Sequence, residues 1–443
     1  MRKLTIAVYT LGCKVNQCDA DTLIAALREL GHDAFHTRDF EQAVDVFVIN
    51  TCTVTHVSDK KSRQMIRRAK KQNTFVAMCG CMARRRRLAP QATPARDSTG
   101  HKHVSKPVSP EGVDFIFDAR KPDDFIAALP LFFTDADKVQ SSSVRFEMAN
   151  IASGNKTRAF IKIQDGCDRF CSYCIVPHVR GEMSSRSVAE IISESESLVN
   201  AGALEIVLTG IQVASYGHDT DNLASLIRRV TALPNLERLR LSSIDPWAVN
   251  DDFLSAVAES PALCDHFHLS LQSGCDATLQ RMNRRYTTAE YAKAAESLRC
   301  LRPNIALTTD IIVGFPSESD SDFEESLAFI RKMKFAKIHV FEFSPREGTP
   351  AAEFPSQVPQ VVKSTRGKIM RELAAQLQSQ FLEAQVGKTL NVLFEQETST
   401  GIFVGNSENY CRVQVESQQN LTNILTKIKI TTCTAEYLTG NLQ

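Results

Sequence analysis

The sequence predicts an α/β fold class with three parts: an N-terminal doubly wound parallel α/β domain, a central (βα)6 partial barrel and a small all-β barrel at the C-terminus. Apolar strand-like runs alternate with amphipathic helices from residue 4 onward, and the alternation resumes after residue 156 with more units. Short strands separated by turn residues follow the last long helix. We place the domains at residues 3–135, 156–384 and 385–443, with a linker at 136–155.

In the N-terminal part, strands are expected at residues 4–9, 44–49 and 74–78, with helices at 19–30 and 58–71 between them. The run Val44–Ile49 is almost continuously apolar, which is typical of a parallel strand that is buried on both faces. A further strand at 111–117 and a helix at 122–129 complete the domain. Residues 83–110 are rich in arginine and proline and predict a mobile surface loop.

Each of the first three strands runs into a turn that contains cysteine. Cys13 follows the first strand, Cys52 the second, and Cys79 and Cys81 the third. The carboxyl ends of parallel strands meet at one edge of a sheet, where ligands usually bind. The pattern therefore favours a three-thiolate metal site, although spacing alone does not separate Cys79 from Cys81 and buried strand-end cysteines are common.

The central part contains six candidate strands and five helices. The strands are expected at residues 158–163, 205–208, 238–241, 266–271, 305–313 and 337–343, and the helices at 188–200, 222–231, 252–259, 288–301 and 321–332. Six such units suit a parallel barrel whose active site lies at the carboxyl ends of the strands. A long helix at 359–385 then leads to C-terminal strands at 389–394, 410–415 and 424–430.

Composition excludes several classes of protein. Hydrophobic residues make up 43% of the chain and charged residues 23%, which is typical of a globular protein. We recognise no signal peptide or membrane span in the sequence. Thirteen cysteines without a secretion signal indicate metal ligation in a reducing cytoplasm. The net charge of +1 means that an argument for nucleic acid must come from local basic patches.

The most informative stretch is the loop that contains Cys167, Cys171 and Cys174, directly after a predicted strand. Three thiolates with no fourth cysteine nearby would leave one iron of a four-iron cluster without a protein ligand, whereas ferredoxins supply four thiolates. An open iron suits a cluster that binds and reduces a substrate. The alternatives are a zinc site completed by His178 and three unrelated buried cysteines.

This spacing resembles the radical S-adenosylmethionine (SAM) signature, and the motifs together resemble the methylthiotransferases, which insert a methylthio group. The resemblance covers almost the whole chain. It includes Gly12-Cys13, Asn50-Thr-Cys52, Gly80-Cys81-Met82, the Cys167–Cys174 loop, Pro177-His-Val-Arg-Gly181, Leu208-Thr-Gly210, Ser270-Leu-Gln-Ser-Gly-Cys275 and Phe343-Ser-Pro345. The C-terminal barrel is similar to a TRAM domain, which is an RNA-binding module.

The resemblance implies two [4Fe-4S] clusters and two SAM molecules per turnover. Cys167, Cys171 and Cys174 would hold the catalytic cluster, and Cys13, Cys52 and Cys81 an auxiliary one, which leaves Cys79 outside. The residues implied for the SAM pocket are Tyr173, Thr209, Gly210, Ser243, Gln272 and Asp310. Each polar strand-end residue has an ordinary alternative role in a turn. A reductant such as flavodoxin or ferredoxin, a monomer and no membrane partner complete the expectations.

Within the family, Cys13-Lys-Val-Asn-Gln17 and Lys61-Ser-Arg-Gln64 resemble the branch that modifies N6-threonylcarbamoyladenosine at tRNA position 37, beside the anticodon. Isopentenyladenosine-37, a ribosomal-protein aspartate, and a non-catalytic iron–sulfur RNA-binding protein are the alternatives. Contacts with phosphate are expected from the basic residues Lys60, Lys61, Arg63, Arg67, Arg68, Arg84 and Arg85. Phe394, Phe403 and Tyr410 are candidates for base stacking, with core packing expected for at least two of them.

Overall fold

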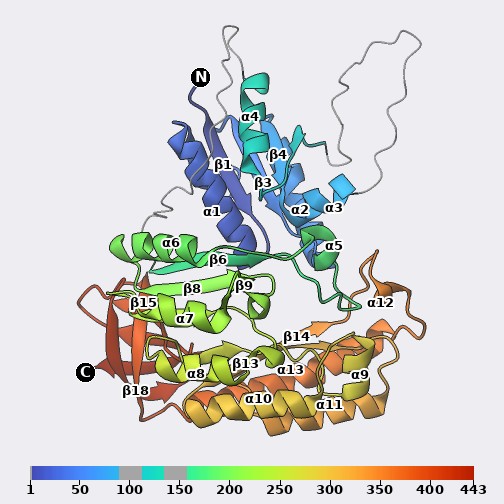
Figure 1. The fold of residues 1–443 in the computed structure, drawn as a ribbon, viewed down its shortest axis with the longest axis vertical. Coiled ribbons are helices and arrows are strands. Elements are labelled where there is room, and N and C mark those ends of the chain that lie inside the picture. Colours follow the sequence, from blue (N-terminus) through green and yellow to red (C-terminus); the bar gives the residue numbers. More distant parts are fainter. Residues whose placement is uncertain (1, 89–111, 134–156) are drawn as a thin grey trace. The chain divides into compact units, whose positions relative to one another are not determined.

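The computed structural model describes residues 2–88, 112–133 and 157–443 (Figure 1). The chain forms two compact units: unit 1 is Met1–Ile151 with Ile175–Gly181, and unit 2 is Ala152–Cys174 with Glu182–Gln443. The three predicted domains thus divide differently, because the C-terminal barrel joins the central barrel in unit 2. The linker predicted at 136–155, and residues 89–110 of the predicted surface loop, lie outside the described residues.

Unit 1 is a parallel sheet with helices on both faces. Its strands lie in the order β2-β1-β3-β4-β5. They span Thr5–Thr10 (β1), Asp33–His36 (β2), Val46–Thr51 (β3), Phe75–Cys79 (β4) and Phe115–Ile116 (β5), and the helices span Lys14–Glu29 (α1), His56–Lys70 (α2), Gly80–Leu88 (α3), Pro122–Phe132 (α4) and Val176–Arg180 (α5). Apolar residues of α1 and α4 form one core with the sheet, and those of α2 and α3 form a second core on the other face. The doubly wound prediction is confirmed.

Two helix starts in unit 1 differ from the predicted ones. Helix α1 begins at Lys14 and not at residue 19, because Asn16, which the sequence predicts as part of a turn, lies inside the helix with its side chain buried. Helix α3 begins at Gly80, directly after β4, where the sequence predicts a turn.

The central barrel of unit 2 contains six parallel strands, as the sequence predicts (Figure 1). They are β6 (Arg158–Asp165), β8 (Glu205–Gly210), β11 (Arg238–Leu241), β12 (His266–His268), β13 (Ala306–Val313) and β14 (Lys337–Glu342). Parallel bridges from Leu239 to Leu263 and from Ile244 to Leu269 join the two halves. Among the described strands β14 and β6 do not pair, so the barrel is partial.

Short strands and a set of helices complete this barrel. The short strands are β7 (Ser184–Ser185), β9 (Gly217–His218) and β10 (Asp221–Asn222), and the 3-10 turns are η1 (Val213–Ser215) and η2 (Pro246–Ala248). The helices are α6 (Val188–Asn200), α7 (Leu223–Thr231), α8 (Asp251–Glu259), α9 (Asp276–Arg281), α10 (Thr288–Leu301), α11 (Asp320–Met333), α12 (Pro350–Glu353) and α13 (Gln360–Glu383). Side chains of Ser187, Asn222, Thr287 and Ser319 close capping boxes at α6, α7, α10 and α11.

The C-terminal strands form a closed barrel in the order β15-β16-β17-β19-β18. They span Thr389–Ser399 (β15), Ile402–Ser407 (β16), Arg412–Glu416 (β17), Leu425–Cys433 (β18) and Leu438–Leu442 (β19). The sequence predicts an all-β barrel here but misses β16 and β19, whose glycines (Gly405 and Gly440) weaken the strand pattern.

The small barrel is fastened to the central one by buried arginines of β11. Arg238 donates to the carbonyl oxygen of Asn406 at 2.9 Å, and Arg240 pairs with Glu205 at 2.8 Å. The Tyr410 ring lies 4.5 Å from the Arg240 guanidinium and 4.7 Å from the His266 ring. No helix in the described ranges is long and apolar enough to span a bilayer.

Candidate functional site

The first cysteine cluster lies at the carboxyl edge of the unit 1 sheet. Because β1 is followed by β2 on one side and β3 by β4 on the other, the chain leaves these neighbouring strands in opposite directions. Such a switch point opens a crevice where ligands bind in doubly wound folds. Cys13 follows β1 and is the N-cap of α1, while Cys52 follows β3. Cys81 lies in the first turn of α3, directly after β4.

Asn16 holds these turns together. Its amide nitrogen donates to the carbonyl oxygen of Leu11, just after β1, at 2.8 Å and to that of Thr51, at the end of β3, at 3.0 Å. Its amide oxygen lies 4.0 Å from the Sγ atoms of both Cys13 and Cys81. The structure therefore brings Cys13 and Cys81 around one buried side chain.

Cys52 joins the group through its contact with Gly12. A Cβ atom on Gly12 would lie 3.2 Å from Cys52 Sγ and 2.9 Å from Asn16 Nδ2, and the Gly12 φ of +104° also disfavours any side chain. The third thiol thus lies against the residue that precedes Cys13. The three cysteines of the predicted auxiliary site share one edge of the sheet.

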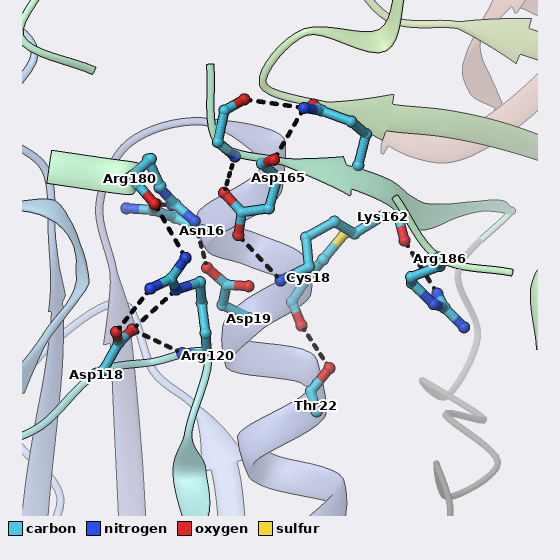
Figure 2. A network of polar contacts seen from close by, with 12 residues as sticks. Asn16, Cys18, Asp19, Thr22, Asp118, Arg120, Lys162, Asp165, Arg180 and Arg186 are labelled. Carbon is cyan, nitrogen blue, oxygen red and sulfur yellow. Dashed lines mark hydrogen bonds and ion pairs between the residues drawn. The ribbon is translucent and has the colours of Figure 1, made fainter. Parts of the chain in front are cut away.

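A buried arginine adds positive charge to this group (Figure 2). Arg180 of α5 forms an ion pair with Asp19 at 3.0 Å, and both side chains are almost fully buried. It also donates to the amide oxygen of Asn16. Its carbonyl oxygen accepts hydrogen bonds from Arg84 at 3.0 Å and Arg120 at 2.9 Å. Both the side chain and the backbone of Arg180 therefore hold α5 to the rest of unit 1.

Burial raises the pKa of the Cys81 thiol to about 11, and the neighbouring Arg180 opposes that rise. An isolated thiolate is therefore unfavourable here, whereas a bound metal supplies the positive charge that a thiolate needs. The pKa of Cys79 is also raised by burial, but Cys79 packs in the core beneath α1 and α4. The structure thus separates Cys79, in the apolar core, from Cys81, beside Asn16.

The second cysteine cluster lies in the loop after β6. Backbone and side-chain hydrogen bonds fix this loop to the segment after α9: Ser172 N donates to Met282 O at 3.0 Å, and Asn283 Nδ2 donates to Phe170 O at 2.9 Å. Burial, with the nearby Cys171, raises the pKa of Cys167. The pKa of Tyr173 is raised by burial and by Cys171 and Cys174. The loop thus carries Cys167, Cys171 and Cys174 within eight residues, with Cys171 and Cys174 joined by a backbone hydrogen bond of 2.9 Å.

Arg284 is the positively charged side chain beside this second group of cysteines. Its guanidinium donates to Cys171 Sγ at 3.4 Å and forms an ion pair with Asp245, and both charged side chains are more than nine-tenths buried. Gln212 donates to the other carboxylate oxygen of Asp245, and its backbone N–H donates to Gln164 at 2.7 Å. A fixed positive charge beside three thiols suits an anionic iron–sulfur cluster, so the donor set fits the predicted cofactor.

The predicted SAM-pocket residues lie in the cysteine loop and at or after strands β8, β11, β12 and β13 of the central barrel. Tyr173 packs edge-on against Phe315, with ring centroids 6.3 Å apart. Thr209 is buried at the end of β8, and a side chain on Gly210 would press on the Gln164 backbone at 3.0 Å. Gln272 has a φ of +71° and exchanges backbone hydrogen bonds with Asp310 and Ile312, while Ser243 is exposed. Their contacts with SAM remain predictions.

The basic residues predicted for RNA differ in exposure. Those on α2 are exposed: Lys60, Lys61, Arg63, Arg67 and Arg68. Arg84 is instead turned inward, where it pairs with Asp118 at 3.2 Å. Half-buried Arg85 lies 4.0 Å from Asp59. The expectation for Arg84 is thus corrected: its side chain is 11% exposed because it is used within unit 1.

The aromatic candidates of the small barrel are engaged in packing. Phe394 and Phe403 are core residues, as the sequence analysis expects for two of the three. Tyr410 lies beneath the Arg240 guanidinium and beside His266. Its ring therefore joins the two barrels of unit 2, and its stacking on bases stays a prediction, since the residue is 37% exposed.

Known proteins resemble the chain over nearly its full length. The threonylcarbamoyladenosine tRNA methylthiotransferase MtaB of Bacillus subtilis is 36% identical over 436 residues, covering 96% of this chain and 93% of that protein. The chain belongs to the tRNA methylthiotransferase family. Residues 161–330 match the radical SAM superfamily, and residues 5–97 match Uncharacterized protein family UPF0004.

Family members with a different named product are almost as similar. The tRNA-2-methylthio-N(6)-dimethylallyladenosine synthase of Acetivibrio thermocellus is 32% identical, covering all of this chain and 91% of that protein. The solved structure of the radical SAM methyltransferase TsrM from Kitasatospora setae covers 78% of this chain and 75% of that chain with a TM-score of 0.55. At 15% identity this likeness confirms the fold alone.

Membership in the radical SAM superfamily implies SAM and a [4Fe-4S] cluster, which the residues around Cys167, Cys171 and Cys174 fit. In the sequence, Asn16 and Arg180 stand out only as members of the Cys13–Gln17 and Pro177–Gly181 motifs and have no predicted role of their own. Arg284, the polar residue beside Cys171, is not predicted at all. The signal that could have revealed these residues is a polar side chain at a position that the fold buries.

Proposed function

We propose that this methylthiotransferase inserts a methylthio group at C2 of N6-threonylcarbamoyladenosine at position 37 of tRNA. The methylthiotransferase chemistry is supported by two separate three-cysteine groups, each with its own buried arginine, and the substrate by the 36% identity to the Bacillus subtilis MtaB. Arg180 lies beside Cys13 and Cys81, and Arg284 donates to Cys171. The reaction requires one cluster that generates the radical and a second cluster that delivers the sulfur.

The C2–H bond of adenine is beyond the reach of side-chain acids and bases, so a cofactor must supply the reactive species. When bound, the cluster at Cys167, Cys171 and Cys174 supplies the electron that cleaves SAM, and the second cluster supplies sulfur. Arg284 and Asp245 hold Cys171 in place from within the barrel. Tyr173 and Phe315 form an apolar wall beside the loop that excludes water.

The proposal extends to partners. The exposed basic face of α2, with Lys60, Lys61 and Arg63, would meet phosphate of the anticodon stem-loop. A second SAM, consumed in each turnover to methylate the sulfur, and a flavodoxin- or ferredoxin-like reductant complete the scheme. We propose that the protein acts as a monomer in the cytoplasm.

The test is nucleoside mass spectrometry of tRNA from cells that lack the gene and from cells in which it is restored. We expect 2-methylthio-N6-threonylcarbamoyladenosine to disappear and to return with the gene. Loss of the isopentenyl analogue instead would place the chain with the dimethylallyladenosine branch. An unchanged set of tRNA nucleosides would refute a tRNA substrate and favour a ribosomal-protein aspartate or a non-catalytic role.

A further inference from the structure

One face of the last strands of the central barrel carries a polar cluster that no part of the mechanism above uses. On β14, Ile338 and Val340 pack in the core with helices α11 and α13. Side chains alternate along a strand, so Lys337, His339 and Phe341 lie on the opposite face. On β13, by the same alternation, Thr308, Asp310 and Ile312 share that face. The register pairs Asp310 with His339 and Ile312 with Phe341.

The centre of this face is a triad of titratable groups. The ligand atoms of His268, Asp310 and His339 all lie within 4.8 Å of one another. His268 Nε2 is 3.3 Å from the Asp310 carboxylate, and His268 Nδ1 is 3.1 Å from the Thr308 hydroxyl. Burial lowers the pKa of His339, so its ring is mostly neutral at pH 7 and offers one donor and one acceptor.

The two ends of the face differ in character. Toward the carboxyl end, Ile312 packs against the aromatic cluster of Tyr173 and Phe315, and Phe341 is 47% exposed. Toward the amino end, exposed Lys337 makes no ion pair with any residue that the structure describes. Asp310 lies two residues from Ile312 on the same strand, about 6.7 Å away. An apolar platform, a hydrogen-bonding centre and a cation therefore follow one another along about 13 Å of strand, from Phe341 to Lys337.

We propose that this face recognises the N6 substituent of the target adenosine: Phe341 and Ile312 contact the base, Asp310, His268 and His339 bind the ureido group, and Lys337 meets the terminal carboxylate. This inference rests on the proposed function and deepens it. A threonylcarbamoyl group carries N–H donors, a hydroxyl and a carboxylate, which match the groups present. A dimethylallyl group offers no hydrogen bond and no charge to these groups. Sites of this kind discriminate strongly against a substrate that lacks the polar group.

The assignment moves Asp310 from the SAM pocket, where the family resemblance suggested it, to the substrate. Lys337 and His339 are exposed side chains of β14, the edge strand of the β12-β13-β14 sheet.

The test is the affinity of the cluster-loaded protein for anticodon stem-loop RNAs that carry threonylcarbamoyladenosine, isopentenyladenosine or adenosine at position 37. Fluorescence anisotropy gives the ratio of dissociation constants. We expect the wild-type protein to prefer the threonylcarbamoyl RNA over the adenosine RNA. Lys337→Met and His339→Leu should each reduce this ratio on the order of tenfold, with little change for the adenosine RNA. Lys332→Met, an equivalent charge loss on exposed α11, should leave the ratio unchanged.

The outcomes separate the two proposals. A wild-type protein without preference for the threonylcarbamoyl RNA contradicts the proposed substrate itself. A wild-type preference that both variants retain refutes only the recognition face. An equal loss of affinity for all three RNAs would make Lys337 a general phosphate contact. The protein can also be dialysed against a chelator that leaves both clusters intact. If the wild-type ratio of dissociation constants is then lost, the triad binds a cation, and direct recognition of the ureido group is refuted.

Discussion

Replacing Arg180 tests whether the buried ion pair of unit 1 supports the auxiliary cysteine site. The side chains of Arg180 and Asp19 are only 2% and 1% exposed, and their charged atoms lie 3.0 Å apart. Arg180→Met leaves the Asp19 carboxylate buried without this partner. Breaking a buried pair in this way costs about 3–5 kcal/mol. For a unit of this size the midpoint of thermal unfolding falls by about 2–4 °C per kcal/mol, so a drop of about 6–20 °C is expected.

The measurement is differential scanning calorimetry of the full-length, cluster-loaded protein under anaerobic conditions. The double variant Asp19→Leu/Arg180→Met should recover most of the loss, because an apolar pair of similar volume often replaces a buried ion pair at little cost. Arg229→Met is the matched control, since Arg229 is 57% exposed and its pair with Asp221 is a surface contact. Its midpoint should hardly move.

Two results would refute the reasoning. One is an Arg180→Met midpoint as high as that of Arg229→Met, which would mean that the buried pair contributes no more than a surface pair. The other is a double variant as unstable as the single one, which would place the loss in the hydrogen bond to Asn16 and not in the uncompensated carboxylate.

Three further predictions concern the same features. Gly12→Ala should roughly halve the iron content after reconstitution, because the new Cβ would press on Cys52 and Asn16. The control Gly31→Ala has a φ of +84° and open space around the new Cβ, so this variant should keep its iron. Equal loss of iron in both variants would contradict the steric argument. Glu205→Gln should cost about 3–5 kcal/mol at pH 7 by thermal unfolding, since it breaks the buried pair with Arg240. Burial opposes ionisation of Glu205, but Arg240 and its neighbours lower the Glu205 pKa overall. The stability that ionised Glu205 contributes is therefore present above the unfolded pKa of 4.5 and is lost as the pH falls through the lower folded pKa. The stability of the variant should thus approach that of the wild type in acid. Tyr410→Ala should destabilise unit 2 by about 1–3 kcal/mol without weakening stem-loop binding measured by anisotropy, and a selective loss of RNA affinity would return Tyr410 to the nucleic-acid surface.

The parts of the structure that the sequence predicts well are those with a local signal. The apolar run that ends at Ile49 forms the buried strand that this pattern indicates, and the strand continues through the buried polar residues Asn50 and Thr51. The strand-then-cysteine repetition predicts Cys13, Cys52 and a third thiol at one edge, and the fold places them there. The six strands of the central barrel follow for the same reason, because each combines an apolar run with a following amphipathic helix.

The parts that the sequence analysis misses depend on contacts between distant residues. Asn16 looks like a loop residue, yet its amide bonds the carbonyl oxygen of Thr51, which lies 35 positions away along the chain. Arg84 belongs to a run of four arginines that suggests a solvated patch, but Asp118 draws it inward. Tyr410 has the exposed, aromatic character of a stacking residue, and only the position of Arg240 gives it a different partner. No periodicity in the sequence records such pairings.

The fastening of the small barrel has a practical consequence for experiments on this protein. Deleting residues 385–443 would remove Tyr410 and the carbonyl oxygens that Arg238 uses, and would open Arg240 and Glu205 to solvent. The truncated chain would be a damaged enzyme, and its loss of activity would be misread as evidence for RNA binding by the barrel. Surface substitutions on exposed residues such as Arg412 and Lys427 leave that joint whole. They are therefore the appropriate way to ask what the barrel touches.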